Sequence, residues 1–153
     1  MIRMMVVDMD DQQCVAHLTA ASFGRLGVVV NGKPEIFPVH HAYDPVTGCV
    51  VFQTNTRTKL HAAMDWPSVA FEVDGLDPDH EWGGWSVLIV GRAEEITDRE
   101  EISRAARLHP TLWGSDDSER WIRIVPEKMT GRYVTRIPAE EGEREDVREG
   151  SRA

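Results

Sequence analysis

The chain has 153 residues, of which 41% are hydrophobic and 28% are charged, and its net charge at pH 7 is −9. This is the composition of an ordinary globular protein, and the length suits one domain with a proper core rather than two. Nucleic acids are bound through clustered Lys and Arg, whereas here 17 cations face 26 anions. The charge balance therefore argues against a nucleic-acid partner.

Neither a membrane span nor a secretion signal is expected. No run approaches the roughly 20 apolar residues that cross a bilayer. The apolar run near the N-terminus stops at Asp8, so it is too short and too acidic for a signal peptide. Cys14 and Cys49 have no metal-ligand spacing, which is typical of free, buried thiols in a reducing compartment. We expect a cytoplasmic protein with no membrane partner.

The first half of the chain predicts a helix over residues 10–21 and a meander of three antiparallel strands over 24–30, 35–43 and 49–54. In the helix, Val15 and Leu18 lie on one side, and Asp10 or Asp11 serves as the N-cap. The first two strands are joined by Asn31-Gly32, the strongest short hairpin signal.

The second half predicts a short helix over 58–65 that Pro67 ends, followed by a strand over 68–74, a glycine-rich loop over 75–84 and a strand over 85–96. After these we expect a helix from 97 to about 108, a loop over 109–117, and two closing strands over 120–125 and 129–137. Val69, Phe71 and Val73 alternate with outward-facing residues, as in a half-buried strand. Thr97 and Glu100 have the spacing of a capping box.

About six strands with a few short helices predict an α+β domain, dominated by β structure, whose antiparallel sheet closes into a small barrel over residues 1–137. Residues 138–153 are rich in charge and contain Val147 as the one aliphatic residue besides alanine. We expect them to form an acidic, disordered tail.

Common catalytic and nucleotide-binding signatures are missing from the sequence, which has no GxSxG, HExxH, GxxxxGK[ST] or GxGxxG. His40 and His41 form the one adjacent histidine pair. Because neighbours on a strand point to opposite faces, these two cannot chelate one metal. We expect one packed and one solvated histidine, and no metal site.

The segment FQTNTRTKL (residues 52–60) concentrates hydroxyls and cations between a strand and a helix. Thr54, Thr56 and Thr58 supply the hydroxyls, and Arg57 and Lys59 supply the charge. A phosphate monoester is bound by such groups beside the backbone N–H groups of a helix N-terminus. Local sequence leaves two readings open, a phosphate site and a solvated loop in which Thr58 caps a helix.

Three of the five tryptophans, Trp82, Trp85 and Trp113, lie in or beside glycine-bearing loops. Such residues can stack on a planar ring. They can equally cap the core or form a dimer interface.

Six segments between Leu18 and Arg132 occur in a fixed order: FGRLGVVVNGKPEIFPVHHAYD (23–44), VVFQTNTRTKL (50–60), PSVAFEVDGLD (67–77), GWSVLIVGRAEEI (84–96), PTLW (110–113) and ERWIRIVPEKMTGRYV (119–134). As an ordered set they resemble the pyridoxamine 5'-phosphate oxidase-like superfamily of flavin-binding split barrels. The nearest branch is the one with the nitroimidazole-resistance-type flavoproteins.

The resemblance implies an antiparallel six-stranded split β-barrel with short flanking helices, working as a homodimer that holds FMN in a groove between subunits. One subunit would bind the phosphate through Lys59 and Thr58, with Arg57 and Thr54 nearby, and would place the ring against Pro38, Val39 and His40. The other subunit would contribute Trp85, Ser86 and Trp113.

The function that the resemblance implies is that of an FMN-dependent oxidoreductase, similar to flavin reductases and nitroreductases, acting on a small organic substrate. His40 is a further candidate for a catalytic or substrate-binding role. Two alternatives stay open, a deazaflavin-dependent reductase and a non-catalytic flavin-binding module. The segment from Thr130 to Ala153 departs from the family members that oxidise pyridoxamine phosphate, since it lacks their substrate-binding basic and histidine residues. That activity is therefore not expected.

Overall fold

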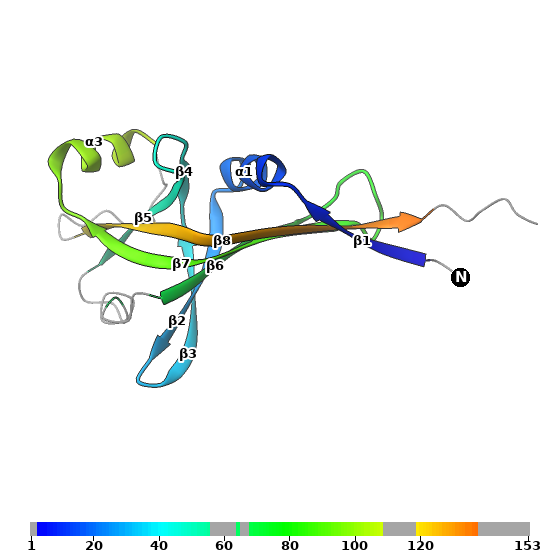
Figure 1. Cartoon of the computed structure of the whole chain (residues 1–153), viewed down its shortest axis with the longest axis horizontal. Coiled ribbons are helices and arrows are strands. Elements are labelled where there is room, and N and C mark those ends of the chain that lie inside the picture. Colours follow the sequence, from blue (N-terminus) through cyan, green and yellow to red (C-terminus); the bar gives the residue numbers. More distant parts are fainter. Residues whose placement is uncertain (1–2, 56–63, 65–67, 109–118, 138–153) are drawn as a thin grey trace, which may run out of the picture.

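The computed structural model describes residues 3–55, 64, 68–108 and 119–137, drawn in colour in Figure 1. Within them an antiparallel eight-stranded sheet carries two short helices. The elements are β1 (Arg3–Met9), α1 (Asp11–Ala20), β2 (Phe23–Val30), β3 (Lys33–His40), β4 (Ala42–Asp44), β5 (Cys49–Asn55), β6 (Ser68–Leu76), β7 (Gly84–Ile96), α3 (Arg99–Arg107) and β8 (Glu119–Ile137). Apart from Met64, the helix predicted over 58–65 lies outside the described residues, as do the whole of the predicted loop 109–117 and the predicted tail.

The strands follow the order β3-β2-β6-β7-β8-β5-β4, and β1 pairs with β8 beside that path. β8 is the long central strand in Figure 1. One of its edges pairs with β7, and the other pairs first with β5 and then with β1. The sheet is not closed, so the closure predicted from the strand count is wrong, whereas the split barrel that the family resemblance implies is confirmed.

The predicted three-stranded meander is wrong at its second strand. The run predicted over 35–43 breaks at His41, where β3 ends its pairing with β2 and β4 begins its pairing with β5. The backbone N–H of His41 donates to the carbonyl of Ser22 instead of a ladder partner. β3 and β5 are consequently not neighbours in the sheet order. The hairpin before the break is confirmed, with φ of 52° at Asn31 and 74° at Gly32.

The two closing strands predicted over 120–125 and 129–137 form one strand, β8. Pro126 looks like a strand breaker in the sequence, but it sits at a β-bulge where the register shifts between Val90 and Gly91. Bulges accommodate the missing N–H of proline. The apolar segment near the N-terminus adds β1, which the sequence did not predict because its pairing partner is more than a hundred residues away. The sheet thus has eight strands within the described residues, where the family resemblance implied six.

Both helices begin at an aspartate. At α1 the prediction of Asp10 is confirmed, since its carboxylate accepts from Gln13 N at 2.8 Å and Gln13 Oε1 accepts from Asp10 N at 3.0 Å. At α3 the predicted cap Thr97 is wrong. The next residue, Asp98, accepts from Glu101 N at 3.0 Å, so the helix begins one residue later.

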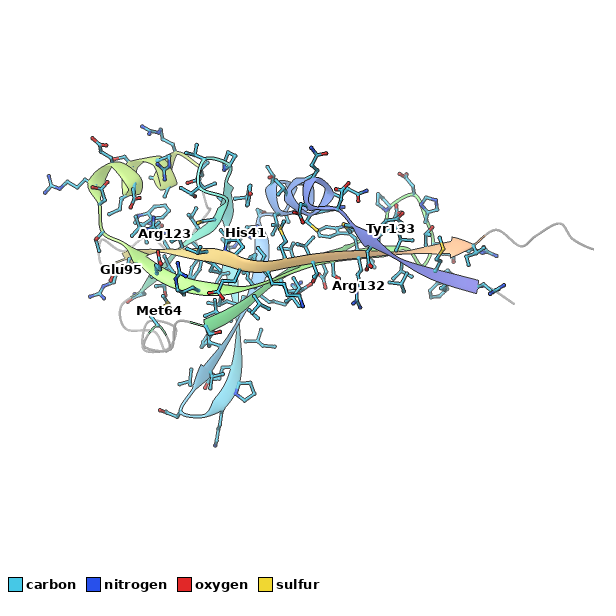
Figure 2. The ribbon with its side chains drawn as sticks, in the orientation of Figure 1. His41, Met64, Glu95, Arg123, Arg132 and Tyr133 are labelled. Atoms are coloured by element: carbon cyan, nitrogen blue, oxygen red, sulfur yellow. The ribbon has the colours of Figure 1, made fainter. Side chains whose placement is uncertain are left out.

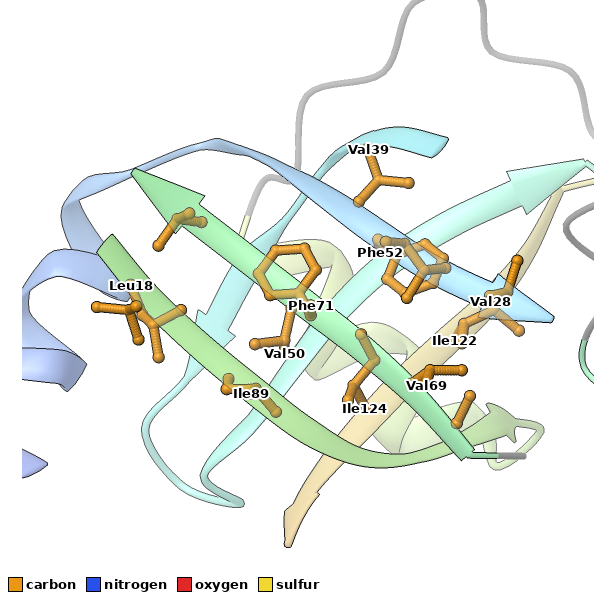
Figure 3. Close-up of a cluster of buried hydrophobic side chains, with 14 of the residues drawn as sticks. Leu18, Val28, Val39, Val50, Phe52, Val69, Phe71, Ile89, Ile122 and Ile124 are labelled. Atoms are coloured by element: carbon orange, nitrogen blue, oxygen red, sulfur yellow. The ribbon is translucent and has the colours of Figure 1, made fainter. Parts of the chain in front are cut away.

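The hydrophobic core lies between the inward-facing sides of the strands (Figure 3). The predicted inward set on β6 is confirmed, with Val69, Phe71 and Val73 all buried. Cys14 and Cys49 are free, buried thiols, as predicted. Neither described helix has the length and apolar character that a bilayer crossing requires.

Most of the exposed large apolar side chains in the described residues project from one face of the sheet, which we call the open face. Cross-strand pairing places on that face Met4, Val6, Phe23, Val29, Ile36, Leu76, Leu88 and Val90. The core residues of β6 and β7 point the other way.

Candidate functional site

The structure describes six of the ten predicted site residues. These are Thr54, Pro38, Val39, His40, Trp85 and Ser86. The predicted phosphate-binding side chains Arg57, Thr58 and Lys59, together with Trp113, lie outside the described residues.

Thr54 is an inward-facing residue at the end of β5. Its exposed fraction is 5%, and it continues the buried row of Val50 and Phe52. A threonine at the last inward position of a strand places a hydroxyl at the edge of the core. The other residues predicted to bind the phosphate, Arg57, Thr58 and Lys59, begin three residues later in the sequence.

On β3, Val39 points into the core, while Pro38 and His40 project to the open face. Opposite Val39 stands Gly24, where a Cβ atom would overlap the Phe71 ring and lie 2.9 Å from the carbonyl oxygen of Glu72. Only glycine fits there. This end of the β2–β3 hairpin is thereby held tightly against the core.

His40 and Phe23 are directly opposite each other on β3 and β2. Their rings meet edge to face, with centroids 5.0 Å apart and planes at 64°. His40 is half-buried by this contact rather than solvated, which corrects the prediction for one of the two histidines. The pair forms an aromatic ledge at the edge of the open face.

His41 is the packed histidine, with an exposed fraction of 2%. Its Nε2 lies 3.1 Å from the carbonyl oxygen of Leu18, and its ring stands edge-on to Phe71 with centroids 4.9 Å apart. Within the described residues its Nδ1 has no hydrogen-bond partner. Burial lowers the pKa of His41, and the neighbouring His40 adds to the effect, although the Leu18 carbonyl opposes it. A neutral ring that donates from Nε2 ties α1 to the break between β3 and β4.

A cavity of about 510 Å³ lies where β6, β7, β8 and β1 run side by side. Its lining includes Val6, Asp74, Leu76, Trp85, Ser86 and Arg132. Ser86 is directly opposite both Asp74 and Arg132 in the ladder, so these three side chains share the open face. Arg25 Nη2 holds Asp74 at 2.6 Å, and Arg132 Nε lies 3.7 Å from the carboxylate of Asp8.

Trp85 points to the opposite side of β7 from Ser86. Its indole stacks on the His17 ring of α1, with centroids 4.1 Å apart and planes at 28°. Trp85 and Ser86, which the family resemblance assigns to the same cofactor contact, thus line one cavity from adjacent positions. Their side chains, however, point to opposite faces of the sheet.

Thr54 and Ser86 lie near opposite ends of β8, since Thr54 is opposite Arg120 and Ser86 is opposite Arg132. At about 3.3 Å per residue these two residues are on the order of 40 Å apart along the strand. One flavin mononucleotide cannot reach both within a single subunit. Pro38, Val39 and His40 lie on β3, which pairs with β2 and not with β8.

Arg132 and His17 were missed by sequence reasoning. Arg132 falls on a charged, alternating stretch, and nothing local indicates which strand lies beside it. His17 looks like an ordinary helix-surface residue until α1 is packed over β7. Among the described residues, no group of three or more His, Cys, Asp or Glu side chains could hold a metal ion.

Comparison with known proteins gives matches over most of the chain. A family model described as pyridoxamine 5'-phosphate oxidase matches residues 10–133. An uncharacterized Mycobacterium tuberculosis protein, Rv0080, is 33% identical over 132 residues, which cover 82% of this chain and 84% of that protein.

Two solved structures show the same fold. A Mycobacterium smegmatis protein described as FAD-binding superimposes with a TM-score of 0.72 at 28% identity, covering 83% of this chain and 98% of that one. A Bacteroides thetaiotaomicron protein named for 5-nitroimidazole antibiotic resistance superimposes with a TM-score of 0.71, covering 88% of this chain and 91% of that one. Because the latter is 16% identical, it supports the fold alone.

Proposed function

The chain belongs to the pyridoxamine 5'-phosphate oxidase family, and we propose that it is a flavin-dependent oxidoreductase that acts on a small organic substrate as a cytoplasmic homodimer. The observation that carries the proposal is the separation of Thr54 from Ser86 along β8. Thr54 and the adjacent pair Trp85 and Ser86 can serve one cofactor only if they come from two different subunits.

The open face supplies the surface for that dimer. Val29, Leu88 and Val90 are between 41% and 44% exposed on the central strands, and Leu76 is 85% exposed beside the cavity. Burying this face against a second copy would remove apolar area from water. It would also bring one subunit's cavity toward the other subunit. A stable interface of this kind typically buries more than about 1,000 Å².

The cofactor we propose is FMN. Its phosphate would be bound by Lys59 and Thr58, with Arg57 and Thr54 beside them. The described residues fit a flavin, since the ledge of His40 and Phe23 offers a flat aromatic edge and Ser86 and Arg132 offer polar groups. Bound flavin would supply hydride and electron transfer, while the chain holds and orients it. The protein's net charge of −9 makes local cations necessary for a phosphate.

The test is mass spectrometry of the ligand released from freshly purified protein, followed by FMN titration of the apo-protein. We expect released FMN. Released FAD would support the proposal of a flavin cofactor but would show that the flavin is FAD rather than FMN. The Mycobacterium smegmatis protein described as FAD-binding is a precedent for that result. A bound deazaflavin, or colourless protein that titrates with no flavin, would refute the proposal.

Lys59→Ala should weaken FMN binding by a factor of ten or more, because a charge-assisted phosphate contact is worth roughly 1.5–3 kcal/mol. Lys33→Ala is the matched control, since Lys33 lies exposed at the start of β3. Equal affinities of the two variants would show that Lys59 does not bind the phosphate.

A non-catalytic flavin-binding module is the second candidate. It is favoured by the titratable groups of the cavity, since Asp74 and Arg132 each lie in an ion pair with a charged neighbour. No general acid or base is therefore evident there. Flavin-loaded protein that passes electrons to no acceptor from either nicotinamide donor would establish this candidate.

A further inference from the structure

A second cavity, of about 290 Å³, lies on the other side of the sheet, between α1 and the ladder of β7, β8 and β1. Its walls include Met9, Gln13, His17, Asp77, Trp85 and Tyr133. Trp85 and Tyr133 are directly opposite each other in the ladder, so both rings project toward α1. Figure 2 shows Tyr133 on this side of β8 and Arg132, from the first cavity, on the other.

The aromatic wall of this cavity is held rigidly. One face of the Trp85 indole carries the stacked ring of His17. The indole also lies close over Gly75, where a Cβ atom would stand 2.8 Å from three of its ring atoms. Contacts with α1 and with β6 therefore fix the indole without a ligand. A wall that is already ordered costs little conformational entropy when a ligand packs against it.

Asp77 is the charged group of this cavity. Its Oδ1 accepts from the backbone N–H of Asp79 at 2.9 Å, and its Oδ2 lies 2.8 Å from His80 Nδ1. The Asp79 N–H, with further help from His80, lowers the pKa of Asp77 despite the opposing effect of desolvation. The carboxylate is thus ionised at neutral pH and is held in place by its own loop.

The described lining of this cavity contains the carboxylate of Asp77 and no Lys or Arg, whereas the lining of the first cavity contains Arg132. An anionic ligand would meet the Asp77 carboxylate, and the lining offers no Lys or Arg to balance its charge. A planar cation would meet the ionised Asp77 acceptor together with the ring of Tyr133 and the side chain of Met9.

We propose that this cavity is a binding site for a small aromatic cation, with the ring packed among Trp85, Tyr133 and Met9 and the positive group directed to the Asp77 carboxylate. The volume lies at the lower end of the roughly 300–1,000 Å³ of small-molecule sites, which suits a single ring. The cavity shares Trp85 with the proposed flavin site but lies on the other side of the sheet, and the proposal does not depend on bound flavin.

Benzamidine and benzoate test the proposal, because they share a ring and differ in the sign of their charge. Each is titrated into the full-length protein, with whatever flavin it carries, by calorimetry. We expect saturable binding of benzamidine and none of benzoate. Benzoate binding as tight as that of benzamidine, or no saturable benzamidine binding, would overturn the proposal.

Three variants localise the ligand. Asp77→Asn keeps the shape of the side chain and should weaken benzamidine binding at least tenfold. Glu81→Gln makes the same charge change on the same loop and should alter the affinity less than twofold. Arg132→Ala reports on the first cavity and should have no effect. A loss with Arg132→Ala but not with Asp77→Asn would contradict the assignment.

Should Asp77→Asn fail to fold, the unmodified protein still provides the answer. Benzamidine should shift the indole N–H signal of Trp85 in a nitrogen–proton NMR spectrum, with the signal assigned by its loss in Trp85→Phe. Saturable benzamidine binding that leaves this signal in place would count against the site. Flavin absorbance, followed in the same samples, separates this result from any failure of the proposed function.

Discussion

At the scale of single residues, His41 makes stability depend on pH. Its pKa is lowered from 6.5 in the fold, chiefly by burial, so the folded chain keeps the ring neutral where the unfolded chain protonates it. Above pH 6.5 both states are neutral and the effect is absent. Below it, the free energy of unfolding should fall by up to about 1.4 kcal/mol per pH unit until the folded ring also titrates.

His41→Gln tests this, because glutamine can still donate to the Leu18 carbonyl but does not titrate. Urea unfolding between pH 7.5 and pH 5 should show a shallower loss of stability in the variant than in the native chain. Parallel curves for the two proteins would mean that other groups cause the pH dependence.

Gly91 is the residue on which the β-bulge depends. A Cβ atom there would meet the carbonyl oxygen of Val125 and lie 3.0 Å from its carbonyl carbon and 3.2 Å from the Cα of Pro126. These are backbone atoms, which cannot rotate away. Gly91→Ala should therefore lower the free energy of unfolding by about 2 kcal/mol or more.

The control for Gly91 is Gly27→Ala. The nearest atoms to a Cβ at Gly27 are 3.7 Å away, an ordinary contact. This variant should change stability by less than about 1 kcal/mol in thermal unfolding. A similar, small effect of both substitutions would show that β8 can move at Pro126.

At the scale of elements, Asp44 joins the turn after β4 to α3. Its carboxylate is 2% exposed and accepts from Val46 N at 3.0 Å, Thr47 Oγ1 at 2.9 Å and Arg104 Nε at 3.2 Å. Burial alone would raise the pKa of Asp44, but these partners outweigh it and lower the pKa. The stabilisation is present at neutral pH and is lost as the pH falls through the lowered value.

Asp44→Ala should cost about 2 kcal/mol in urea unfolding at pH 7, since it leaves buried donors without an acceptor. Arg104→Gln should cost about 1 kcal/mol or less, because the partly exposed guanidinium makes a solvent-screened pair. A larger loss from Arg104 than from Asp44 would show that the ion pair, rather than the turn, is the main attachment.

At the scale of the whole molecule, the exposed apolar side chains of the open face predict that two copies of the chain form a dimer. Leu88→Lys puts a charge at the centre of that face and should shift light scattering from twice the chain mass of 17.3 kDa to the chain mass itself. Flavin should be lost together with the dimer, because Thr54 of one subunit would separate from Trp85 and Ser86 of the other.

Val46→Lys is the matched control for assembly. Val46 is 75% exposed in the turn between β4 and β5, away from the open face. This variant should stay dimeric and keep its flavin. A native chain that scatters as a monomer while retaining flavin would contradict the shared site.

Much of the local structure follows from short-range patterns. Alternation at Val69, Phe71 and Val73, the Asn31-Gly32 turn and the Asp10 cap each depend on residues within a few positions of one another, and each is confirmed. The phosphate-binding part of the candidate site stays a prediction that rests on family resemblance, because the segment FQTNTRTKL alone does not distinguish a phosphate site from a capped loop.

What the sequence by itself determined about this protein is its antiparallel β character, its family and the types of residue available for a flavin site, since those reside in local periodicity and in the order of segments. The tertiary structure alone decided that β1 and β5 share an edge of β8, that Arg132 lies beside Ser86, and that His17 stacks on Trp85. Strand register and helix packing join residues far apart in the chain. Their free energy comes from burying side chains together, which no local pattern records.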